Sequence, residues 1–434
     1  MQMGLSVAFY TLGCKLNFAE TSAMARSFEA AGYRRVEWEE AADVYVINTC
    51  TVTDNADKRV RSLVRGVLRR RPDAYIVAAG CYAQVNPGEI QRTGGVDLVV
   101  GSADKFRITD YISSVEKEKQ TRILCGDIAA DKDYHGAYSL SERTRAFLKI
   151  QDGCDYKCSY CTIPKARGGS RSEPLESVIR SAENIVAAGT YEIVLTGVNT
   201  GDWGHASGTG ETFFDLVKAM DRVEGLRRVR ISSIEPNLIT DEILEFIASS
   251  DKFVPHFHIP LQSGCDDVLR DMRRRYLTSL YHHRVEKIKK LMPHACIGAD
   301  VIVGFPTETD EHFRRTYDFI ASLDLSYLHV FTYSERENTP AAEMGVSVPP
   351  AVRAKRSKVL HLLGGKKRAE FYRQHVGSVR EVLFESENKN GYISGFTDNY
   401  IKVRYPWDDS LVNTLRQVRL SAPGADGTMD CELL

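Results

Sequence analysis

The chain has 434 residues, enough for two or three domains, with 43% apolar and 26% charged residues, as in ordinary globular proteins. Its ten cysteines are too sparse for a disulfide scaffold, and no apolar run reaches the length of about eighteen residues that a membrane span needs. We expect a cytosolic protein, since no secretion-like apolar segment opens the chain. The net charge of −1 says nothing about the partners of the protein.

Strand and helix patterns alternate over the first 120 residues. Strands are predicted over 6–11, 43–49, 75–80 and 96–100, with helices over 19–31 and 56–71. Strands separated by helices favour a doubly wound parallel sheet. A cysteine follows each of the first three strands: Cys14, Cys50 and Cys81. Because ligand sites in such sheets gather at the carboxyl ends of the strands, these cysteines predict an iron–sulfur site, with three unrelated buried thiols as the alternative.

A second alternating region follows a polar segment. Residues 116–142 lack periodicity and are predicted to be a linker, in which Cys125 has no assigned role. Further strands are predicted over 146–150, 192–196, 228–232, 256–260, 297–303 and 327–333, with helical stretches after the first five. Six such units predict a partial (β/α)6 barrel, whose active site would lie at the C-terminal ends of the strands.

Three cysteines follow the first strand of this barrel with CxxxCxxC spacing: Cys154, Cys158 and Cys161. A four-iron cubane normally takes four thiolates, so three close cysteines leave one iron open. S-adenosylmethionine (SAM) can chelate an open iron through its amino and carboxylate groups, and an electron from the cluster can then release a radical. A zinc knuckle or a disulfide loop is the alternative, but zinc sites usually show paired spacing and a nearby fourth ligand. The run resembles the signature of the radical-SAM superfamily.

Polar residues follow the later barrel strands. The turn 196–199 can hold the amino-acid part of SAM, although a plain turn is the alternative. The hydroxyl and carboxylate groups of 232–235 suit the ribose and the sulfonium, with a helix cap as the alternative. Polar groups and glycines also end the fourth and fifth strands. The predicted SAM contacts are Tyr160, Thr196, Gly197, Asn199, Ser232, Ser233, Glu235, Gln262 and Gly304.

Basic residues are concentrated in three places. Seven cations and no acid lie in 58–71, on a helix with an apolar face, and 353–368 again holds seven cations without a carboxylate. Arg273, Arg274 and Arg275 form a third patch. These runs predict a phosphate-binding track, with solvated amphipathic helices as the alternative.

The last part of the chain changes character. Short β runs separated by turn residues are predicted over 379–384, 391–396, 399–404 and 417–421, which indicates a small all-β module. The fold class is therefore α/β, with a doubly wound N-terminal domain, a partial barrel and a small C-terminal β barrel. The predicted domains are 1–120, a linker over 121–142, 143–370 and 371–434.

Several motifs resemble those of the radical-SAM methylthiotransferase family. They are 11–17 (TLGCKLN), 48–53 (NTCTVT), 80–84 (GCYAQ), the CxxxCxxC loop, 260–264 (PLQSG), 300–308 (DVIVGFPTE), and the segment from Tyr333 to Ala341. The C-terminal module resembles the TRAM domain of this family, an RNA-associated β barrel. The resemblance covers essentially the whole chain.

This resemblance implies two [4Fe-4S] clusters, one on Cys154, Cys158 and Cys161 and an auxiliary one on Cys14, Cys50 and Cys81. It implies that SAM serves both as radical source and as methyl donor, and that carbon 2 of an adenine in tRNA receives the methylthio group. The implied partners are tRNA, with its base splayed from the anticodon loop, and an electron donor such as flavodoxin or ferredoxin, with no membrane and no DNA.

Within the family, residues 13–17 and 195–201 are most similar to the branch that modifies N6-threonylcarbamoyladenosine in tRNA. One sister branch acts on isopentenyladenosine and another on a ribosomal-protein aspartate; a cluster-bearing RNA-binding protein without catalysis is a further alternative. A threonylcarbamoyl group carries a carboxylate, so its pocket should offer a cation. Lys15 and Arg167, one beside each cysteine loop, are the predicted substrate residues, with structural ion pairs as the alternative.

Overall fold

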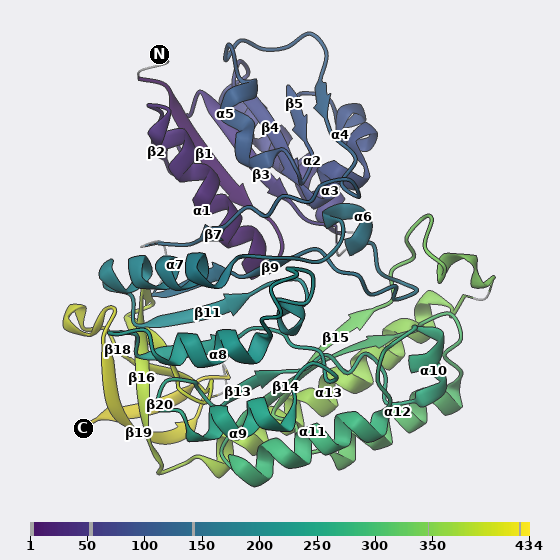
Figure 1. The fold of residues 1–434 in the computed structure, drawn as a ribbon, viewed down its shortest axis with the longest axis vertical. Coiled ribbons are helices and arrows are strands. Elements are labelled where there is room, and N and C mark those ends of the chain that lie inside the picture. The colour runs from purple at the N-terminus through teal and green to yellow at the C-terminus, as the bar shows by residue number, and fades with distance from the viewer. Residues whose placement is uncertain (1–3, 52–54, 141–143, 346, 425–426) are drawn as a thin grey trace.

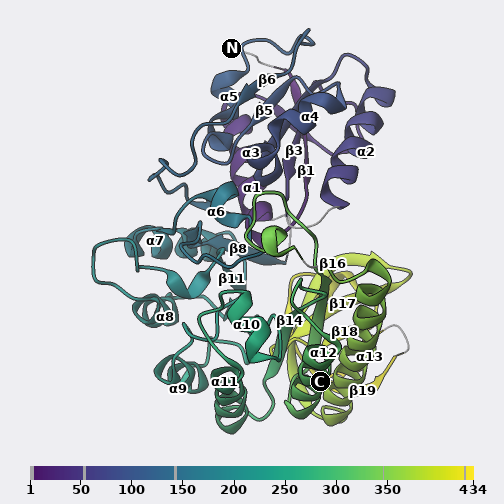
Figure 2. The ribbon, with the colours of Figure 1, turned by 90° about the vertical axis from the view of Figure 1, so that its right-hand side faces the viewer.

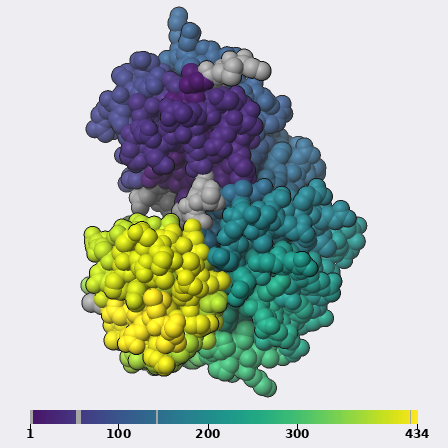
Figure 3. All heavy atoms as spheres, turned by 90° about the vertical axis from the view of Figure 1, so that its left-hand side faces the viewer, coloured from purple at the N-terminus to yellow at the C-terminus, as the bar shows by residue number. Residues whose placement is uncertain are grey.

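Three units follow one another along the chain (Figure 1). This computed structural model describes residues 4–51, 55–140, 144–345, 347–424 and 427–434, without the side chains of 55–57. Val52, Thr53 and residues 141–142 of the predicted linker lie outside the described residues. The N-terminal unit stands above the barrel unit, and the C-terminal unit lies against the side of the barrel unit (Figure 3).

The N-terminal unit is a parallel sheet in the order β2-β1-β3-β4-β5-β6. Its strands are β1 (Ser6–Thr11), β2 (Arg34–Val36), β3 (Val44–Thr49), β4 (Tyr75–Gly80), β5 (Leu98–Val100) and β6 (Arg122–Leu124). Its helices are α1 (Lys15–Ala30), α2 (Asn55–Arg70), α3 (Cys81–Val85), α4 (Pro87–Thr93) and α5 (Ile108–Tyr111), with a 3₁₀ turn at Lys105–Arg107. Successive residues of β3 join two apolar clusters on opposite faces, so the sheet is covered on both sides, as predicted.

The segment predicted as a linker belongs in part to both neighbouring units. Its residues 122–124 form β6, which pairs with β5, and β7 (Ala137–Tyr138) pairs antiparallel with β8 (Arg145–Lys149) of the barrel. Both strands are only two or three residues long, which is too short to leave a periodic pattern in the sequence. Cys125 packs against the N-terminal core rather than standing in an open linker.

The second unit is the predicted open barrel. Its strands are β8 (Arg145–Lys149), β11 (Glu192–Thr196), β12 (Arg228–Ile231), β13 (His256–His258), β14 (Cys296–Val303) and β15 (Tyr327–Thr332). Strands β12-β11-β8-β7 form one sheet and β13-β14-β15 another, and single bridges between Val229 and Phe253 and between Ser233 and His258 join the two sheets. The short strands β9 (Gln151–Asp152) and β10 (Arg171–Ser172) pair beside the cysteine loop.

Helices cover the outside of the barrel, around the largest apolar core of the chain (Figure 1). They are α6 (Ile163–Arg167), α7 (Leu175–Ala187), α8 (Phe213–Asp221), α9 (Asp241–Ser249), α10 (Asp266–Asp271), α11 (Thr278–Leu291), α12 (Asp310–Ser322) and α13 (Pro350–Gln374), with 3₁₀ turns at Thr200–Asp202 and Ala342–Met344. Two adjacent glycines do not end α13, because the helix continues for nine residues beyond Gly365. A Cβ on Gly364 would lie 3.2 Å from Leu328, so this glycine lets the helix pack closely on β15.

The C-terminal unit is a closed five-stranded barrel in the order β16-β17-β18-β20-β19. Its strands are β16 (Val379–Lys389), β17 (Tyr392–Thr397), β18 (Lys402–Pro406), β19 (Leu415–Pro423) and β20 (Met429–Leu433), with a 3₁₀ turn at Asp409–Leu411. It packs on the end of α13, as Figure 2 shows, through a core that includes Phe371 and Tyr372. No helix in the described part of the chain combines the length and apolar character that a membrane crossing needs.

Candidate active site

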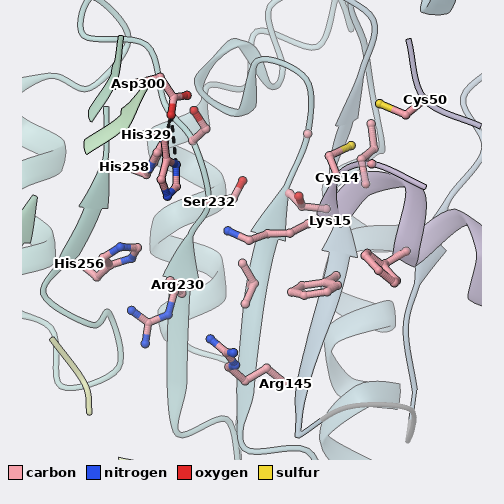
Figure 4. A pocket seen from close by; sticks show the side chains of 18 of the residues that line it. Cys14, Lys15, Cys50, Arg145, Arg230, Ser232, His256, His258, Asp300 and His329 are labelled. Atoms are coloured by element: carbon pink, nitrogen blue, oxygen red, sulfur yellow. Dashed lines mark ion pairs between the residues drawn. The ribbon is translucent and has the colours of Figure 1, made fainter. Parts of the chain in front are cut away.

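Two adjoining cavities lie where the three units meet. The larger has a volume of about 860 Å³ and reaches from Cys14 and Cys50 of the N-terminal unit, across the barrel, to Tyr400 of the C-terminal unit. The smaller, of about 510 Å³, contains Cys161. Asp300 and Phe331 line both cavities. Figure 4 shows the larger cavity, with cysteine thiols on one side and histidine and arginine side chains on the other.

The three N-terminal cysteine loops are held together by a shared network. The side-chain amide of Asn17 donates to the carbonyls of Leu12 (2.7 Å) and Thr49 (3.1 Å), which ties the Cys14 loop to the Cys50 loop. Gly13 has a φ of +101°, and a Cβ there would lie 2.7 Å from the Cys50 sulfur. The Thr49 hydroxyl in turn accepts from the Ala83 amide of the helix that begins at Cys81 (3.1 Å). The predicted convergence of these three strand ends is thus present in the structure.

Arg167 lies at the junction between this network and the barrel. Its guanidinium, 2% exposed, donates to Cys81 Sγ (3.1 Å), to Asn17 Oδ1 (2.7 Å) and to the carboxylates of Glu20 (3.0 Å) and Asp152 (2.9 Å). Arg167 does not line the larger cavity, so its predicted role in binding the substrate is not supported by its position. The alternative of a structural ion pair describes it better.

The barrel cysteines lie in a loop whose sulfur atoms already accept hydrogen bonds. The amides of Tyr156 and Ile163 donate to Cys154 and Cys161, each at 3.4 Å. Arg274 donates to Cys158 Sγ at 3.1 Å. Burial raises the pKa of Cys154 to about 12 and that of Cys161 to about 11, so both thiols are protonated at neutral pH until a metal displaces their protons.

Six of the nine predicted SAM contacts line the two cavities. Thr196, Gly197, Ser232 and Ser233 line the larger one, and Tyr160 and Gln262 the smaller one. Gln151, which the sequence did not single out, fixes the 196–199 turn by accepting from the amides of Val198 (3.0 Å) and Asn199 (2.8 Å).

The other three predicted contacts differ among themselves. The side-chain amide of Asn199 is buried and makes no hydrogen bond of normal geometry to the described residues, which leaves it available to a polar ligand. Glu235 is ion-paired with Arg274 beside Cys158, so it lies near the cysteine loop but is already neutralised. Gly304 lies outside both cavities, and a Cβ there would be 2.4 Å from Arg353; its expected contact with SAM is therefore not supported, and close packing on α13 explains the glycine.

Lys15 and two arginines share the wall of the larger cavity (Figure 4). Arg230 is fully buried and pairs with Glu192, with 2.7 Å between Nε and Oε1. Arg145 pairs with Glu385 of the C-terminal unit at 3.0 Å. Lys15, by contrast, makes no ion pair among the described residues. Burial, followed by the charges of Arg230 and Arg145, lowers the pKa of Lys15 to about 8.

A cluster of one carboxylate and two histidines lines the same cavity, at the rim of strands β13 to β15. The Asp300 carboxylate lies 2.9 Å from His258 Nε2 and 3.3 Å from His329 Nδ1. Burial alone would raise the pKa of Asp300, but its hydrogen bonds to the two histidines hold it well below the usual carboxyl value. The Asp300 motif was expected at this rim, whereas its pairing with both histidines was not.

The basic runs differ in how many of their cations remain exposed. On α2 the apolar face is buried, and Lys58, Arg61, Arg65 and Arg69 line an exposed hollow on the opposite side. On α13, Arg353, Arg356 and Lys367 bind barrel groups instead of solvent. In the third patch, Arg274 is 4% exposed and belongs to the cysteine site, where it donates to Cys158, whereas Arg273 and Arg275 are exposed.

Comparisons with known proteins agree with this geometry. One family model, described as "Uncharacterized protein family UPF0004", matches residues 6–101, and that of the "Radical SAM superfamily" matches residues 148–320. The fold resembles the radical S-adenosylmethionine methyltransferase TsrM of Kitasatospora setae, with a TM-score of 0.59 and 12% identity over 78% of this chain and 75% of that one. Barrel, cysteine loop and family model together define a radical-SAM protein.

Relatives narrow this class further. Threonylcarbamoyladenosine tRNA methylthiotransferase MtaB of Bacillus subtilis is 43% identical over 96% of this chain and 94% of its own. The MtaB protein of Aquifex aeolicus is 37% identical over 92% of this chain and 96% of its own, and tRNA-2-methylthio-N(6)-dimethylallyladenosine synthase of the same organism is 30% identical over 94% of each chain. The chain belongs to the radical-SAM tRNA methylthiotransferase family.

Proposed function

We propose that the chain transfers a methylthio group to carbon 2 of the adenine in N6-threonylcarbamoyladenosine, next to the anticodon of tRNA. The observation that supports this proposal is the pair of adjoining cavities, one lined by Cys14 and Cys50 of the N-terminal unit and the other by Cys161 of the barrel. The choice of nucleoside rests on the relatives, since the MtaB proteins are more similar to this chain than the dimethylallyladenosine synthase of Aquifex aeolicus is.

We assign one [4Fe-4S] cluster to Cys154, Cys158 and Cys161 and an auxiliary one to Cys14, Cys50 and Cys81. Three thiols at each site suit a cubane with one open iron, and hydrogen bonds to ligand sulfurs, such as those from Arg274 and Arg167, are a normal part of such sites. The buried Asn199 amide, which lacks a hydrogen bond of normal geometry in the described part of the chain, supports SAM beside the barrel trio. When bound, these groups supply the electron, the 5′-deoxyadenosyl radical and the sulfur for the reaction.

The side chains of the protein bind and orient the reactants. Asn17 and Arg167 hold the auxiliary loops against the barrel, and Gln151 fixes the turn that offers Thr196 and Asn199 to SAM. Phe18, Phe147 and Val194 give the larger cavity an apolar wall for a base that has left the anticodon stack. The exposed cations on α2 suit the tRNA backbone.

Two further features belong to the proposal. SAM cleavage consumes an electron, and we propose a small redox protein such as flavodoxin or ferredoxin as its source. We place the reaction in the cytoplasm, where tRNA is found and thiols stay reduced. The domain division that we propose keeps 143–370 and 371–434, but it assigns 122–124 to the first domain because β6 completes that sheet.

Nucleoside mass spectrometry tests the function directly. Deleting the gene should remove the 2-methylthio group from threonylcarbamoyladenosine while leaving the precursor nucleoside. Purified, cluster-loaded protein should add the methylthio mass to tRNA carrying threonylcarbamoyl, and not to tRNA carrying isopentenyl or bare adenosine. Efficient turnover of the isopentenyl tRNA, or methylthiolation of a ribosomal protein instead of tRNA, would overturn the substrate assignment.

A further inference from the structure

Lys15 lines the larger cavity without a direct ion-pair partner among the described residues. Of the other cations that line it, Arg230 pairs with Glu192, Arg145 pairs with Glu385, and Arg59 donates to the hydroxyl of Tyr10. Asp300, the carboxylate in the lining, is paired with His258 and His329, and Lys15 makes no ion pair or hydrogen bond among the described residues. Lys15 is half-buried, and a partly desolvated cation without a partner is stabilised when a ligand brings the opposite charge.

Two arginines that line the cavity with Lys15 are fixed by their surroundings. Arg230 is held by Glu192 and lies 4.9 Å from the ring of Tyr400, and Arg145 lies 4.6 Å above the ring of Phe396. Figure 4 shows Lys15 extending from the start of α1 into the cavity, with Ser232 and Arg230 on the facing wall. Its ammonium is therefore placed to receive an anion entering the cavity.

We propose that Lys15, backed by Arg145 and Arg230, binds the carboxylate of the threonylcarbamoyl group and so selects this nucleoside. This inference rests on the proposed function. Lys15 directly follows Cys14, so a carboxylate bound there holds its adenine close to the auxiliary cysteine site. An isopentenyl group at the same place would bury apolar surface against an unpaired ammonium, which disfavours it.

The experiment removes the charge from each partner in turn. Two anticodon stem-loop RNAs are compared, one with N6-threonylcarbamoyladenosine and one in which a carboxamide replaces the carboxylate. Their affinities are measured anaerobically by fluorescence anisotropy with cluster-loaded protein. For wild type, the carboxamide should bind about 10- to 100-fold more weakly, as expected for a hydrogen bond between charged groups. Lys15→Gln should bind the two RNAs about equally, and Lys15→Arg should restore much of the preference.

The controls separate the possible failures. Lys290→Gln, which removes an exposed cation on α11, should keep the wild-type preference. Unchanged binding of the carboxamide RNA to Lys15→Gln shows that this variant is folded. If wild type methylthiolates threonylcarbamoyladenosine but binds both RNAs equally, this inference fails while the proposed function stands. If Lys15→Gln weakens both RNAs equally, Lys15 serves the cysteine site instead, and the inference again fails.

Discussion

The buried charges between the N-terminal unit and the barrel predict how firmly the two units are joined. Glu20 of α1 is 0% exposed and contacts Lys105 (2.6 Å) from its own unit, and Lys149 (3.0 Å) and Arg167 (3.0 Å) from the barrel. Asp152 is the only other carboxylate within this group of described residues, and it also pairs with Lys149 and Arg167. Replacing Glu20 by glutamine keeps the shape of the side chain and leaves three cations facing one carboxylate.

The expected cost follows from the burial of every partner. Breaking a fully buried ion pair typically destabilises a protein by about 3–5 kcal/mol, because the remaining charge stays desolvated. Burial alone would raise the pKa of Glu20, but Arg167, Lys105 and Lys149 hold it well below the usual value. Its stabilising contribution is therefore fully present above the ordinary carboxyl pKa of about 4.3, and it is lost as the pH falls from there toward the lowered native pKa.

Urea titration, together with limited proteolysis of the 116–142 segment, measures this effect. Glu20→Gln should unfold at a lower urea concentration than wild type at pH 7 and be cleaved faster between the two units, and the difference should shrink below about pH 4. Glu387→Gln, which breaks an exposed pair with Lys389 on β16, serves as the control and should change neither measurement. Equal urea midpoints for wild type and Glu20→Gln at pH 7 would refute the reasoning.

Three further outcomes are expected. We infer that the charged form of Lys15 binds the substrate carboxylate, and the pKa of Lys15 is about 8. The affinity for threonylcarbamoyladenosine RNA should therefore stay constant near neutral pH and fall above pH 8, and Lys15→Gln should show no such fall. Neutralising Arg61, Arg65 and Arg69 together should reduce the slope of log affinity for tRNA against log salt concentration by about two to three. An unchanged slope would mean that these arginines only face solvent and do not contact tRNA. Gly13→Ala should displace Cys50 and reduce iron from about eight toward about four per chain without stopping SAM cleavage; full iron content would contradict the packing argument.

The order of the elements was predictable because the central strands are continuous apolar runs. The bounds predicted for β1, β4 and β11 agree with the structure residue by residue. Strands β2, β6 and β7 were missed, since two or three residues at a sheet edge carry too little periodicity to be recognised. The strand β20 was missed although it closes the C-terminal barrel, because its charged residues alternate with only a few buried ones.

The sequence predicts those parts of the candidate site in which a residue's place after a strand is enough to fix where it lies in the fold. Cysteines placed after successive parallel strands must meet at one sheet edge, and polar residues after successive barrel strands must meet at the other. Partners across the junction were not predictable, because Arg167 and Glu20 lie 147 residues apart in the chain. The sequence identified Arg167 as a cation beside a cysteine loop but assigned it to the substrate, whereas its carboxylate partners come from both units.

Arg167 and Arg274 show what such distant partners add to the chemistry. Each donates to one cysteine sulfur, Cys81 and Cys158 respectively, at 3.1 Å, and each is also held by carboxylates. Around Arg167 three cations face two carboxylates, so the surplus positive charge lies against the Cys81 sulfur. A thiolate ligand is thereby stabilised by the same contacts that join the N-terminal unit to the barrel. One group of buried charges therefore supports both the contact between the N-terminal unit and the barrel and the binding of a cluster at the auxiliary site.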